Sequence, residues 1–395
     1  MKKFLTATHS GKRIKIFLCG KRILSIKTQT EVLTNVFQKN NSKKVLVSYI
    51  KKPFLKNTEK SHTNFLECQT ACQIFDELGY NVDIVEFTDE IEIEKLPQYE
   101  IVYGFGKSLE KAFLFPQITK IYYGTGCSPW YQNTQTLKRL NEFYLEKGIS
   151  ADKSVRVSDI NGAYLSNNTI ALGNQFVADT YKIDGIEKNI HHLPAFYYDV
   201  YNIDLDKKDF KKSKHNFIWF GSTGCLHKGL DIVIDIFKER KDINLIICGA
   251  NPSEKAFFKH YEDVFNGSYS NIKYYRFVNI ESEEFKNLMN ECGSVIFPTA
   301  SEGGSPAVLM VMANGGLIPI VSRSAGLDIP NFGIQFDKIS KSSVEKSINT
   351  YLSFSAEELK NRAEITKKTI RENYTFEKYK SNLKSIIGET LQIGK

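Results

Sequence analysis

The sequence predicts an α/β protein with two doubly wound parallel sheets. Short apolar runs rich in Val, Ile and Tyr alternate with segments whose apolar residues recur at helical spacing. The alternation stops in a polar stretch at 201–214, which is typical of an interdomain linker, and then starts again. A chain of 395 residues also exceeds the size at which a single hydrophobic core stops growing. Two Rossmann-like domains of similar size are therefore expected.

The first domain is expected at 44–207, after a basic N-terminal segment at 1–43. Its first strand is the apolar run KVLVSYI, and its first helix is predicted over 64–80, where apolar side chains share one face and Gly79 ends the helix. Further strands are predicted at 81–87, 99–105, 120–126 and 169–173, and further helices at 132–147 and 175–182.

The second domain is expected at 208–373. Its strands are predicted at 216–221, 243–249, 272–277, 294–298 and 317–322, and helices at 229–240, 253–265 and 282–292. The stretch 355–388 is predicted to be helical with a break around 373–375, so a last helical segment is assigned to 374–395.

The stretch SEGGSPAVLMVMANGG at 301–316 predicts a loop followed by a helix. Ser305 suits the N-cap, where its hydroxyl would accept a hydrogen bond from a backbone N–H, and Pro306 suits the first helical position. Gly315 or Gly316 would end the helix in the left-handed region. Buried strands on either side make this a parallel crossover unit, in which ligands bind beyond the carboxyl ends of the strands.

The loop at 299–305 has the chemistry of an anion site beside a hydroxyl acceptor. Backbone N–H groups and the positive end of a helix attract anions. Gly303 and Gly304 lack side chains that would keep a ligand from the backbone, and the Glu302 carboxylate can accept hydrogen bonds from hydroxyl groups. This combination suggests a phosphate joined to a sugar. The alternative is a glycine-rich turn that binds nothing, as in many α/β proteins.

A second informative stretch is HKGLD at 227–231, which follows the strand NFIWFG and opens a helix. Lys228 is expected at the carboxyl end of its strand, on the same edge as Glu302, where it could neutralise a diphosphate. The alternative is a surface lysine at a helix start. A helix dipole disfavours a cation at that end, which favours a ligand role.

No metal or cofactor site is predicted. YGFGKS at 103–108 resembles the end of a phosphate loop, but Ile101 stands where the first glycine is needed. The acidic triplet DLD at 204–206 lies in the polar stretch, which favours solvated charge. The seven cysteines are scattered without a CxxC pair, which indicates reduced thiols in a cytosolic protein. The N-terminus is too charged for a good secretory signal, and no apolar run could span a membrane.

The net charge of +8 is unevenly distributed. Residues 1–60 hold 15 Lys or Arg and 2 Glu, and the remainder of the chain is acidic. Such a segment could contact an anionic membrane surface with the help of IKIFL at 14–18 and RILSI at 22–26, or it could be a solvated basic hairpin. No recognition motif favours nucleic acid as the partner.

Together, FGSTGCLHKGLD and PTASEGGSPAVLMVMANGGLIPIVS resemble the donor domain of retaining family-4 GT-B glycosyltransferases. The segments at 61–87, 121–133 and 171–181 resemble the acceptor domain of bacterial members, so the resemblance covers about 44–388. It implies two domains facing across a cleft and transfer of a sugar from a nucleotide diphosphate-sugar, with retention and without metal, to a hydroxyl of a glycan or lipid-linked acceptor. It also implies a role in surface polysaccharide synthesis, such as lipopolysaccharide or capsule, and a last helix that crosses back onto the first domain.

The resemblance implies catalytic roles for Lys228, on the leaving diphosphate, and Glu302, on the donor sugar. The remaining donor-binding residues that it implies are Gly221, Ser222, Phe277, Val278, Gly303, Gly304, Ser305 and Met310. Candidates on the acceptor side are His62, Asn64, Glu67, Gly126, Cys127 and Ser128.

This sequence also departs from the family pattern. Met310 stands where the family has a second glutamate, and Ser222 stands where it has an arginine that pairs with the lysine. The glycine-rich acceptor loop is replaced by IKKPFLKNTEKSHTN at 50–64, and the acceptor-domain histidine has no clear match. Alternatives are therefore a GT-B sugar phosphorylase or epimerase, or a non-catalytic GT-B binding protein. The expected location is the cytoplasm, with peripheral attachment to the inner face of the membrane as the alternative that the basic segment leaves open.

Overall fold

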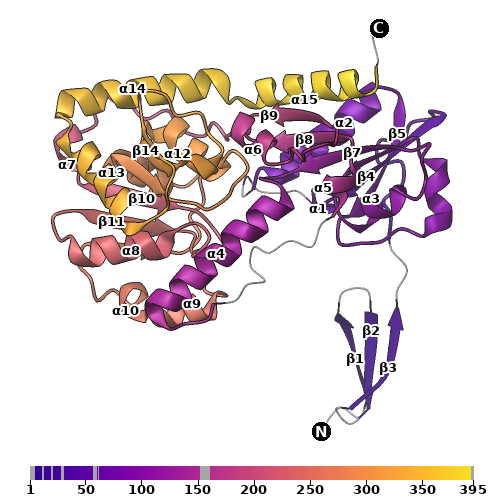
Figure 1. The fold of residues 1–395 in the computed structure, drawn as a ribbon, viewed down its shortest axis with the longest axis horizontal. Helices are drawn as coiled ribbons and strands as arrows, with labels where there is room; N and C mark the ends of the chain where they lie inside the picture. The colour runs from indigo at the N-terminus through magenta and orange to yellow at the C-terminus, as the bar shows by residue number, and fades with distance from the viewer. Residues whose placement is uncertain are drawn as a thin grey trace. The chain divides into compact units, whose positions relative to one another are not determined.

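The computed structural model describes residues 5–10, 13–18, 21–27, 31–56, 60, 62–151 and 161–392 (Figure 1). Within these ranges, no helix is both long and apolar enough to cross a bilayer. The contact with an anionic membrane surface was predicted from the basic side chains of residues 1–60. Most of these side chains are not among those that the structure describes, so the contact stays a prediction.

The backbone of the basic segment forms a three-stranded antiparallel sheet. Its strands are β1 (Leu5–Ser10), β2 (Arg13–Leu18) and β3 (Lys21–Lys27), paired in the order β1-β2-β3. The register between β2 and β3 shifts between Ile16 and Phe17.

A six-stranded sheet, with the order β5-β4-β6-β7-β8-β9, contains the strands predicted for the first half. The strands are β4 (Lys43–Tyr49), β5 (Tyr80–Glu86), β6 (Ile101–Gly104), β7 (Thr119–Gly124), β8 (Asn168–Leu172) and β9 (Asn189–Leu193). The connecting helices are α1 (Lys52–Leu55), α2 (Asn64–Glu77), η1 (Ile93–Gln98), α3 (Lys107–Ala112), α4 (Pro129–Lys147), α5 (Gly162–Leu165) and α6 (Gln175–Asp179). The sequence analysis did not predict β9, whose polar and half-exposed residues form no apolar run.

A second six-stranded parallel sheet, with the order β12-β11-β10-β13-β14-β15, is built from the second half. Its strands are β10 (Asn216–Phe220), β11 (Asn244–Cys248), β12 (Ile272–Tyr275), β13 (Ser294–Phe297), β14 (Ile318–Ser322) and β15 (Ile334–Phe336). The chain winds outward from β10 to β12 and then restarts beside β10 with β13. This reversal creates a topological switch point between the carboxyl ends of β10 and β13, the place where doubly wound sheets bind ligands.

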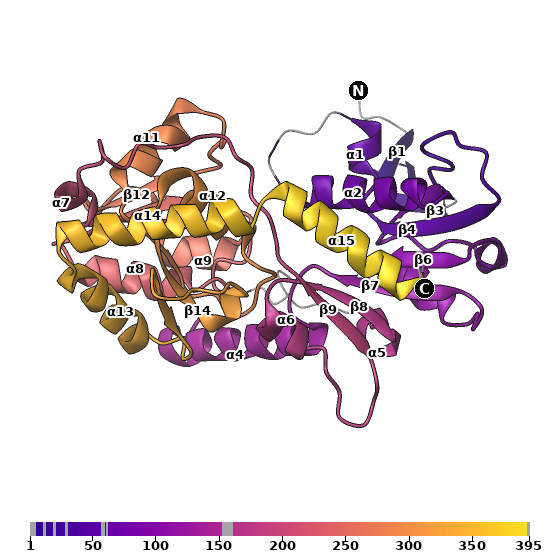
Figure 2. The same cartoon turned by 90° about the horizontal axis from the view of Figure 1, so that it is seen from above.

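The helices of the second half match the sequence prediction with several differences. The helices are α7 (Phe210–Ser213), α8 (Leu230–Glu239), α9 (Lys255–His260), α10 (Glu262–Phe265), α11 (Glu283–Glu291), α12 (Pro306–Gly315), η3 (Arg323–Ala325), α13 (Lys341–Ser353), α14 (Ala356–Asn373) and α15 (Phe376–Thr390). Helix α15 packs against β9 of the first sheet. The helix predicted at 253–265 is divided at Tyr261, and α7, η3 and α13 were not predicted. The break between α14 and α15 is confirmed at Tyr374–Thr375, where the Thr375 hydroxyl caps α15. Figure 2 shows α14 lying across α12 and leading into α15.

The chain divides into two compact units, one from residues 1–57 and 72–121 and the other from residues 58–71 and 122–395. Every predicted site residue belongs to the second unit, so the site is described within that unit. The boundaries at 43, 207 and 373 stay predictions.

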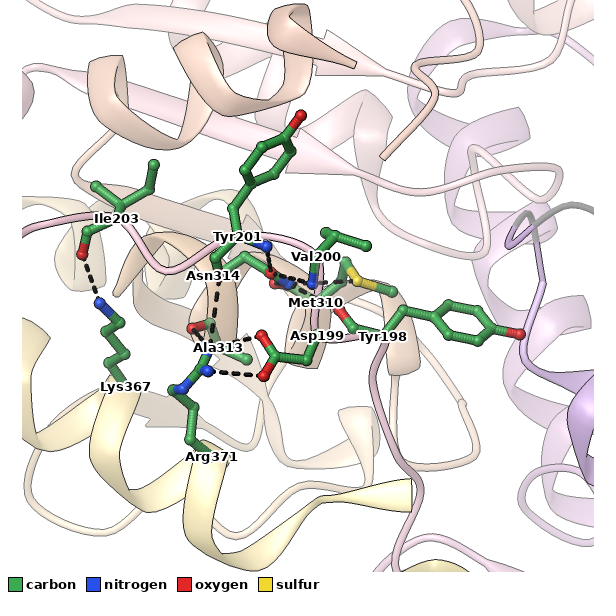
Figure 3. A network of polar contacts seen from close by, with 10 residues as sticks. All are labelled: Tyr198, Asp199, Val200, Tyr201, Ile203, Met310, Ala313, Asn314, Lys367 and Arg371. Carbon is green, nitrogen blue, oxygen red and sulfur yellow. Dashed lines mark hydrogen bonds and ion pairs between the residues drawn. The ribbon is translucent and has the colours of Figure 1, made fainter. Parts of the chain in front are cut away.

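Asn314, near the end of α12, holds the segment that leads into 201–214 (Figure 3). Its side-chain oxygen accepts hydrogen bonds from the backbone N–H groups of Val200 (3.0 Å) and Tyr201 (2.7 Å). Its amide nitrogen donates to the carbonyls of Tyr198 (3.1 Å) and Met310 (2.8 Å). Because the side chain is fully buried, all four bonds are made away from water.

The polar stretch 201–214 is anchored rather than fully solvated. Ile203, Leu205 and Phe210 are buried, whereas Asp204 and Asp206 are exposed, as expected for solvated charge. Lys208 is also buried, and its Nζ donates to the carbonyls of Met289 (2.8 Å) and Gly315 (3.0 Å) at the ends of α11 and α12. Composition alone misses this anchoring because the apolar residues are separated by charged ones.

Lys208 is expected to make stability depend on pH. Burial lowers its pKa from 10.5 to about 7. Below about pH 7 the ammonium must be accommodated in the interior, and this cost disappears as the pH rises toward 10.5, because the unfolded chain then also loses the proton. Its contribution to the free energy of unfolding should therefore rise by at most about 1.4 kcal/mol per pH unit within this window.

Urea unfolding at pH 7.5, 8.5 and 9.5 measures this slope. The Lys208→Met variant should have a shallower slope than the wild type, whatever its absolute stability, and Lys207→Met, at an exposed neighbour, should leave the slope unchanged. Equal slopes for wild type and Lys208→Met would contradict the lowered pKa.

Candidate functional site

Lys228 and Glu302 meet at the switch point, as the sequence predicts. Lys228 follows β10, Glu302 follows β13, and Lys228 Nζ lies 3.8 Å from Glu302 Oε1. Both side chains are largely buried, which strengthens their electrostatic effect on any group that binds beside them. Lys228 Nζ also donates to Ser222 Oγ at 3.1 Å, so the serine at the position where the resembled family has an arginine contacts the lysine.

The loop that carries Glu302 is tied to its surroundings on two sides. The Ala300 N–H donates to the carbonyl of His227 (2.8 Å), and the Glu302 N–H donates to the carbonyl of Ser324 (3.0 Å). Thr299 Oγ1 lies 3.5 Å from Glu302 Oε1. The Glu302 carboxylate is thus carried by a backbone segment with little conformational freedom, residues 299–305, which we call the Glu302 loop.

Ser305 corrects one prediction. It occupies the N-cap of α12, and Pro306 occupies the first helical position as expected. However, the Ser305 backbone is left-handed, with φ of 38°, and its hydroxyl donates to the carbonyl of Ala325 (2.7 Å) instead of accepting from a helix N–H. A tertiary acceptor therefore replaces the local cap. The predicted helix end is confirmed at Gly316, whose φ is 64°.

Gly303 and Gly304 allow a close approach to other loops of the same unit. A Cβ on Gly303 would lie 2.2 Å from the carbonyl oxygen of Thr125 and 2.8 Å from the Cα of Gly126. A Cβ on Gly304, whose φ is +63°, would lie 2.9 Å from the Cβ of Ala195. This packing is a second reason for glycine, beside the ligand access inferred from the sequence. Among the described residues, the N–H groups of Gly303 and Gly304 have no hydrogen-bond acceptor, and both residues are buried.

The other predicted donor-binding residues have different environments. The Gly221 N–H donates to the carbonyl of Cys248 (3.1 Å) at the end of β11. Phe277, just beyond β12, is 66 % exposed, whereas Val278 beside it is buried. Met310 is buried in α12, where its sulfur lies 3.5 Å from the amide nitrogen of Asn314.

Gly126, Cys127 and Ser128, predicted on the acceptor side, lie at the Glu302 loop and the start of α4. Cys127 Sγ donates to the carbonyl of Glu302 (3.5 Å), and burial raises the pKa of the thiol to about 12. The thiol is therefore neutral near pH 7 and a poor nucleophile. Ser128 caps α4 by accepting from the N–H of Tyr131, and the carbonyl of Gly126 accepts from the Tyr181 hydroxyl (2.7 Å).

His62, Asn64 and Glu67, also predicted on the acceptor side, lie among tyrosines. His62 Nδ1 accepts from the N–H of Asn64 (3.1 Å), and the His62 carbonyl accepts from the Tyr198 hydroxyl (3.2 Å). Glu67 is buried and accepts from the Tyr123 hydroxyl (3.0 Å). Burial, and to a lesser extent the Glu67 charge, raises the pKa of Tyr198 to about 12.

The sequence analysis missed His227 and its partners on α4. In the His227 ring, Nδ1 lies 2.9 Å from Thr136 Oγ1, and Nε2 lies 2.7 Å from the carbonyl oxygen of Ser301. One turn along α4, Arg139 forms a buried ion pair with Asp231 of α8 at 2.5 Å. The only sequence signal was the position of His227 directly before Lys228.

No protein-family model and no curated protein matches the sequence. Several solved structures match the fold. HepE from Anabaena, in complex with UDP and glucose, has a TM-score of 0.55 and 13% identity, over 89% of this chain and 100% of its own. A glycosyltransferase from Rickettsia africae has a TM-score of 0.56 and 13% identity, with the same coverage.

An α,α-trehalose 6-phosphate synthase from Burkholderia multivorans has a TM-score of 0.55 and 9% identity, over 90% of this chain and 99% of its own. This chain has the GT-B fold. In GT-B terms, Lys228 and Glu302 lie at the switch point of the C-terminal sheet.

Proposed function

We propose that this protein transfers a sugar from a nucleotide diphosphate-sugar to a hydroxyl of a glycan or lipid-linked acceptor, with retention and without a metal cofactor. The observation that carries the proposal is the meeting of Lys228 and Glu302, together with the N–H groups of Gly303 and Gly304, at the sheet's switch point. These groups provide one cation, one carboxylate and two backbone donors for an anion that is joined to a sugar.

Lys228 would stabilise the departing nucleotide diphosphate. Negative charge builds up on the leaving oxygen as the glycosidic bond breaks, and a cation that is already in place lowers the energy of that state. Burial strengthens the effect because water screens the charge less than at the surface. The N–H groups of Gly303 and Gly304 would supply additional hydrogen bonds to the phosphate or the sugar.

Glu302 would orient the donor sugar by accepting hydrogen bonds from its hydroxyl groups. The backbone bonds of Ala300 and Glu302 hold the loop in place, so the carboxylate has little orientational freedom to lose when a donor binds. The neutral, buried thiol of Cys127 does not suit a covalent intermediate, so we name no nucleophile.

Phe277 would lie against the nucleotide base. Its ring is exposed just beyond the carboxyl end of β12, while the neighbouring Val278 is buried and anchors the segment. An exposed aromatic ring at this edge offers a flat apolar surface on which a base can stack.

Binding of nucleotide-sugars tests the proposal directly. HepE was solved with UDP, which makes UDP-glucose the first ligand to titrate by calorimetry, followed by UDP-N-acetylglucosamine and GDP-mannose. One of these donors should bind wild type and bind Lys228→Ala at least about 10-fold more weakly, the loss expected for one charge-assisted contact.

Binding of a donor that is equally tight in Lys228→Ala would contradict the assigned site. Absence of binding at millimolar concentration, with or without an oligosaccharide acceptor, would instead favour a non-catalytic GT-B protein. Ser222 and the buried Met310 would then be the first residues to examine.

A further inference from the structure

We propose that His227 is a positioning residue that holds the Glu302 loop at a fixed separation from Lys228, and that Thr136 of α4 fixes the tautomer of its ring. The inference rests on the proposed function, because the separation matters for a donor that contacts both groups. His227 lies directly before Lys228, yet its ring extends to a different part of the chain.

The His227 ring is enclosed, and among the described residues each of its nitrogens has a polar partner. The residue is 3 % exposed. Nδ1 lies 2.9 Å from Thr136 Oγ1, and Nε2 lies 2.7 Å from the carbonyl oxygen of Ser301. A buried imidazole with both nitrogens satisfied has one preferred orientation, since turning the ring would break two hydrogen bonds.

The two partners determine which nitrogen carries the proton. The Ser301 carbonyl can only accept, so Nε2 must donate. In the neutral ring Nδ1 is then the acceptor, and the Thr136 hydroxyl, which can do either, must donate to it. Thr136 therefore selects the tautomer that binds the Glu302 loop.

His227 contacts this loop through both its backbone and its side chain. Its carbonyl accepts from the N–H of Ala300 (2.8 Å), and its ring donates to the carbonyl of Ser301, so consecutive loop residues are bound. Lys228 directly follows His227 in the sequence, and Glu302 directly follows Ser301. These two bonds therefore couple the position of the cation to that of the carboxylate.

The separation that results keeps the ion pair between the two charged groups longer than a hydrogen bond. The 3.8 Å between Lys228 Nζ and Glu302 Oε1 exceeds the usual hydrogen-bond range. A looser loop would allow this ion pair to shorten to hydrogen-bond distance. The tighter pair would withdraw the cation from the diphosphate and the carboxylate from the sugar.

The two hydrogen bonds of His227 to Ala300 and Ser301, which we call the clamp, are supported by residues on and near α4. Thr136 lies on the buried face of this helix, and Arg139, one turn away, is paired with Asp231 of α8. Cys127, just before α4, contacts the carbonyl of Glu302. The loop is thus contacted at two points near α4, directly by Cys127 just before the helix and indirectly through the ring of His227, which contacts Thr136 of α4.

Hydrogen exchange of the ligand-free protein tests the clamp without any assumption about activity. In His227→Leu, the amides of 299–305 should exchange at least about 10-fold faster than in wild type, because a local hydrogen bond is lost. In His227→Gln, whose amide nitrogen can occupy the place of Nε2, their protection should stay close to wild type. Unchanged exchange in His227→Leu would overturn the proposal, and so would equal damage in the leucine and glutamine variants.

Measurements of UDP binding and of turnover then test whether the His227 contacts matter for function. UDP is the probe for binding, and the donor identified by calorimetry is the probe for turnover. His227→Leu should weaken UDP binding and lower kcat, each by roughly 10-fold, while His227→Gln stays within about 3-fold of wild type. Partial unfolding alone would reduce the fraction of binding sites but leave the Kd of the remaining sites unchanged.

Thr136 supplies a second variant in case His227→Leu does not fold. Thr136→Val keeps the shape of the side chain but removes its hydroxyl. As in His227→Leu, the amides of 299–305 should exchange faster than in wild type, whereas in Thr136→Ser they should exchange at the wild-type rate. Wild-type exchange in Thr136→Val would overturn the role of Thr136. Failure of the wild type to bind any nucleotide would overturn the proposed function alone, since the exchange comparison does not depend on it.

Discussion

Lys228→Met should lower the turnover of donor sugar by about 100- to 1,000-fold, the loss typical of removing one preorganised group that stabilises developing negative charge. Lys228 is the buried cation at the switch point, where its Nζ lies near Ser222 Oγ and Glu302 Oε1, and neither of these groups can replace its positive charge. Methionine fills a similar volume without charge. Initial rates measured with saturating acceptor and varied donor give kcat and kcat/KM separately.

Two controls make this measurement decisive. Lys212→Met removes an exposed lysine from α7 and should leave turnover unchanged. Thermal unfolding should show that Lys228→Met is folded, because the variant loses a buried charge rather than an apolar contact. Turnover within about 3-fold of wild type in the folded variant would refute the role given to Lys228.

Asn314→Leu should lower the free energy of unfolding by about 3–5 kcal/mol, because each buried polar group left without a partner costs about 1–3 kcal/mol. The substitution removes the acceptor of the Val200 and Tyr201 N–H groups and the donor to the Tyr198 and Met310 carbonyls (Figure 3). Neither strands nor helices supply other partners for the two N–H groups of this irregular segment.

Urea unfolding followed by tyrosine and tryptophan fluorescence measures the loss. The matched control is Asn290→Leu on the neighbouring helix α11, where the side chain is exposed and a change within about 0.5 kcal/mol is expected. Equal stability of the two variants would show that the buried network contributes nothing. The predicted loss is larger than for an ordinary core substitution because one side chain satisfies four backbone groups.

The alternation of strands and helices could be predicted because buried parallel strands leave continuous apolar runs. Strands with weaker patterns were missed. NIHHL, which forms β9, has two adjacent histidines, and IQF, which forms β15, is too short to stand out. Helix α13 could have been found, since Val344, Ile348 and Tyr351 are buried at helical spacing.

Lys228 and Glu302 were predictable because each lies in the loop that follows a buried strand of a parallel sheet, and the ends of such strands share one edge. The contact between His227 and Thr136 was not predictable, since 91 residues separate the two and no local pattern links them. The cap by Ser305 was predicted wrongly for a related reason. Its hydroxyl found a better-placed acceptor in Ala325, which only the tertiary structure brings near.

The hydroxyl groups of Tyr123 and Tyr379 lie 3.0 Å apart, although 256 residues separate them in the chain. Tyr123 also donates to Glu67, so one buried cluster combines residues that lie far apart in the chain. At about 5–20 residues per second, the ribosome needs roughly 10–50 s to reach Tyr379 after Tyr123 has been made. Throughout that interval the nascent chain holds an unfinished polar cluster, and any chain that terminates before α15 never completes it. This part of the second unit can therefore finish folding only after α15 has been made.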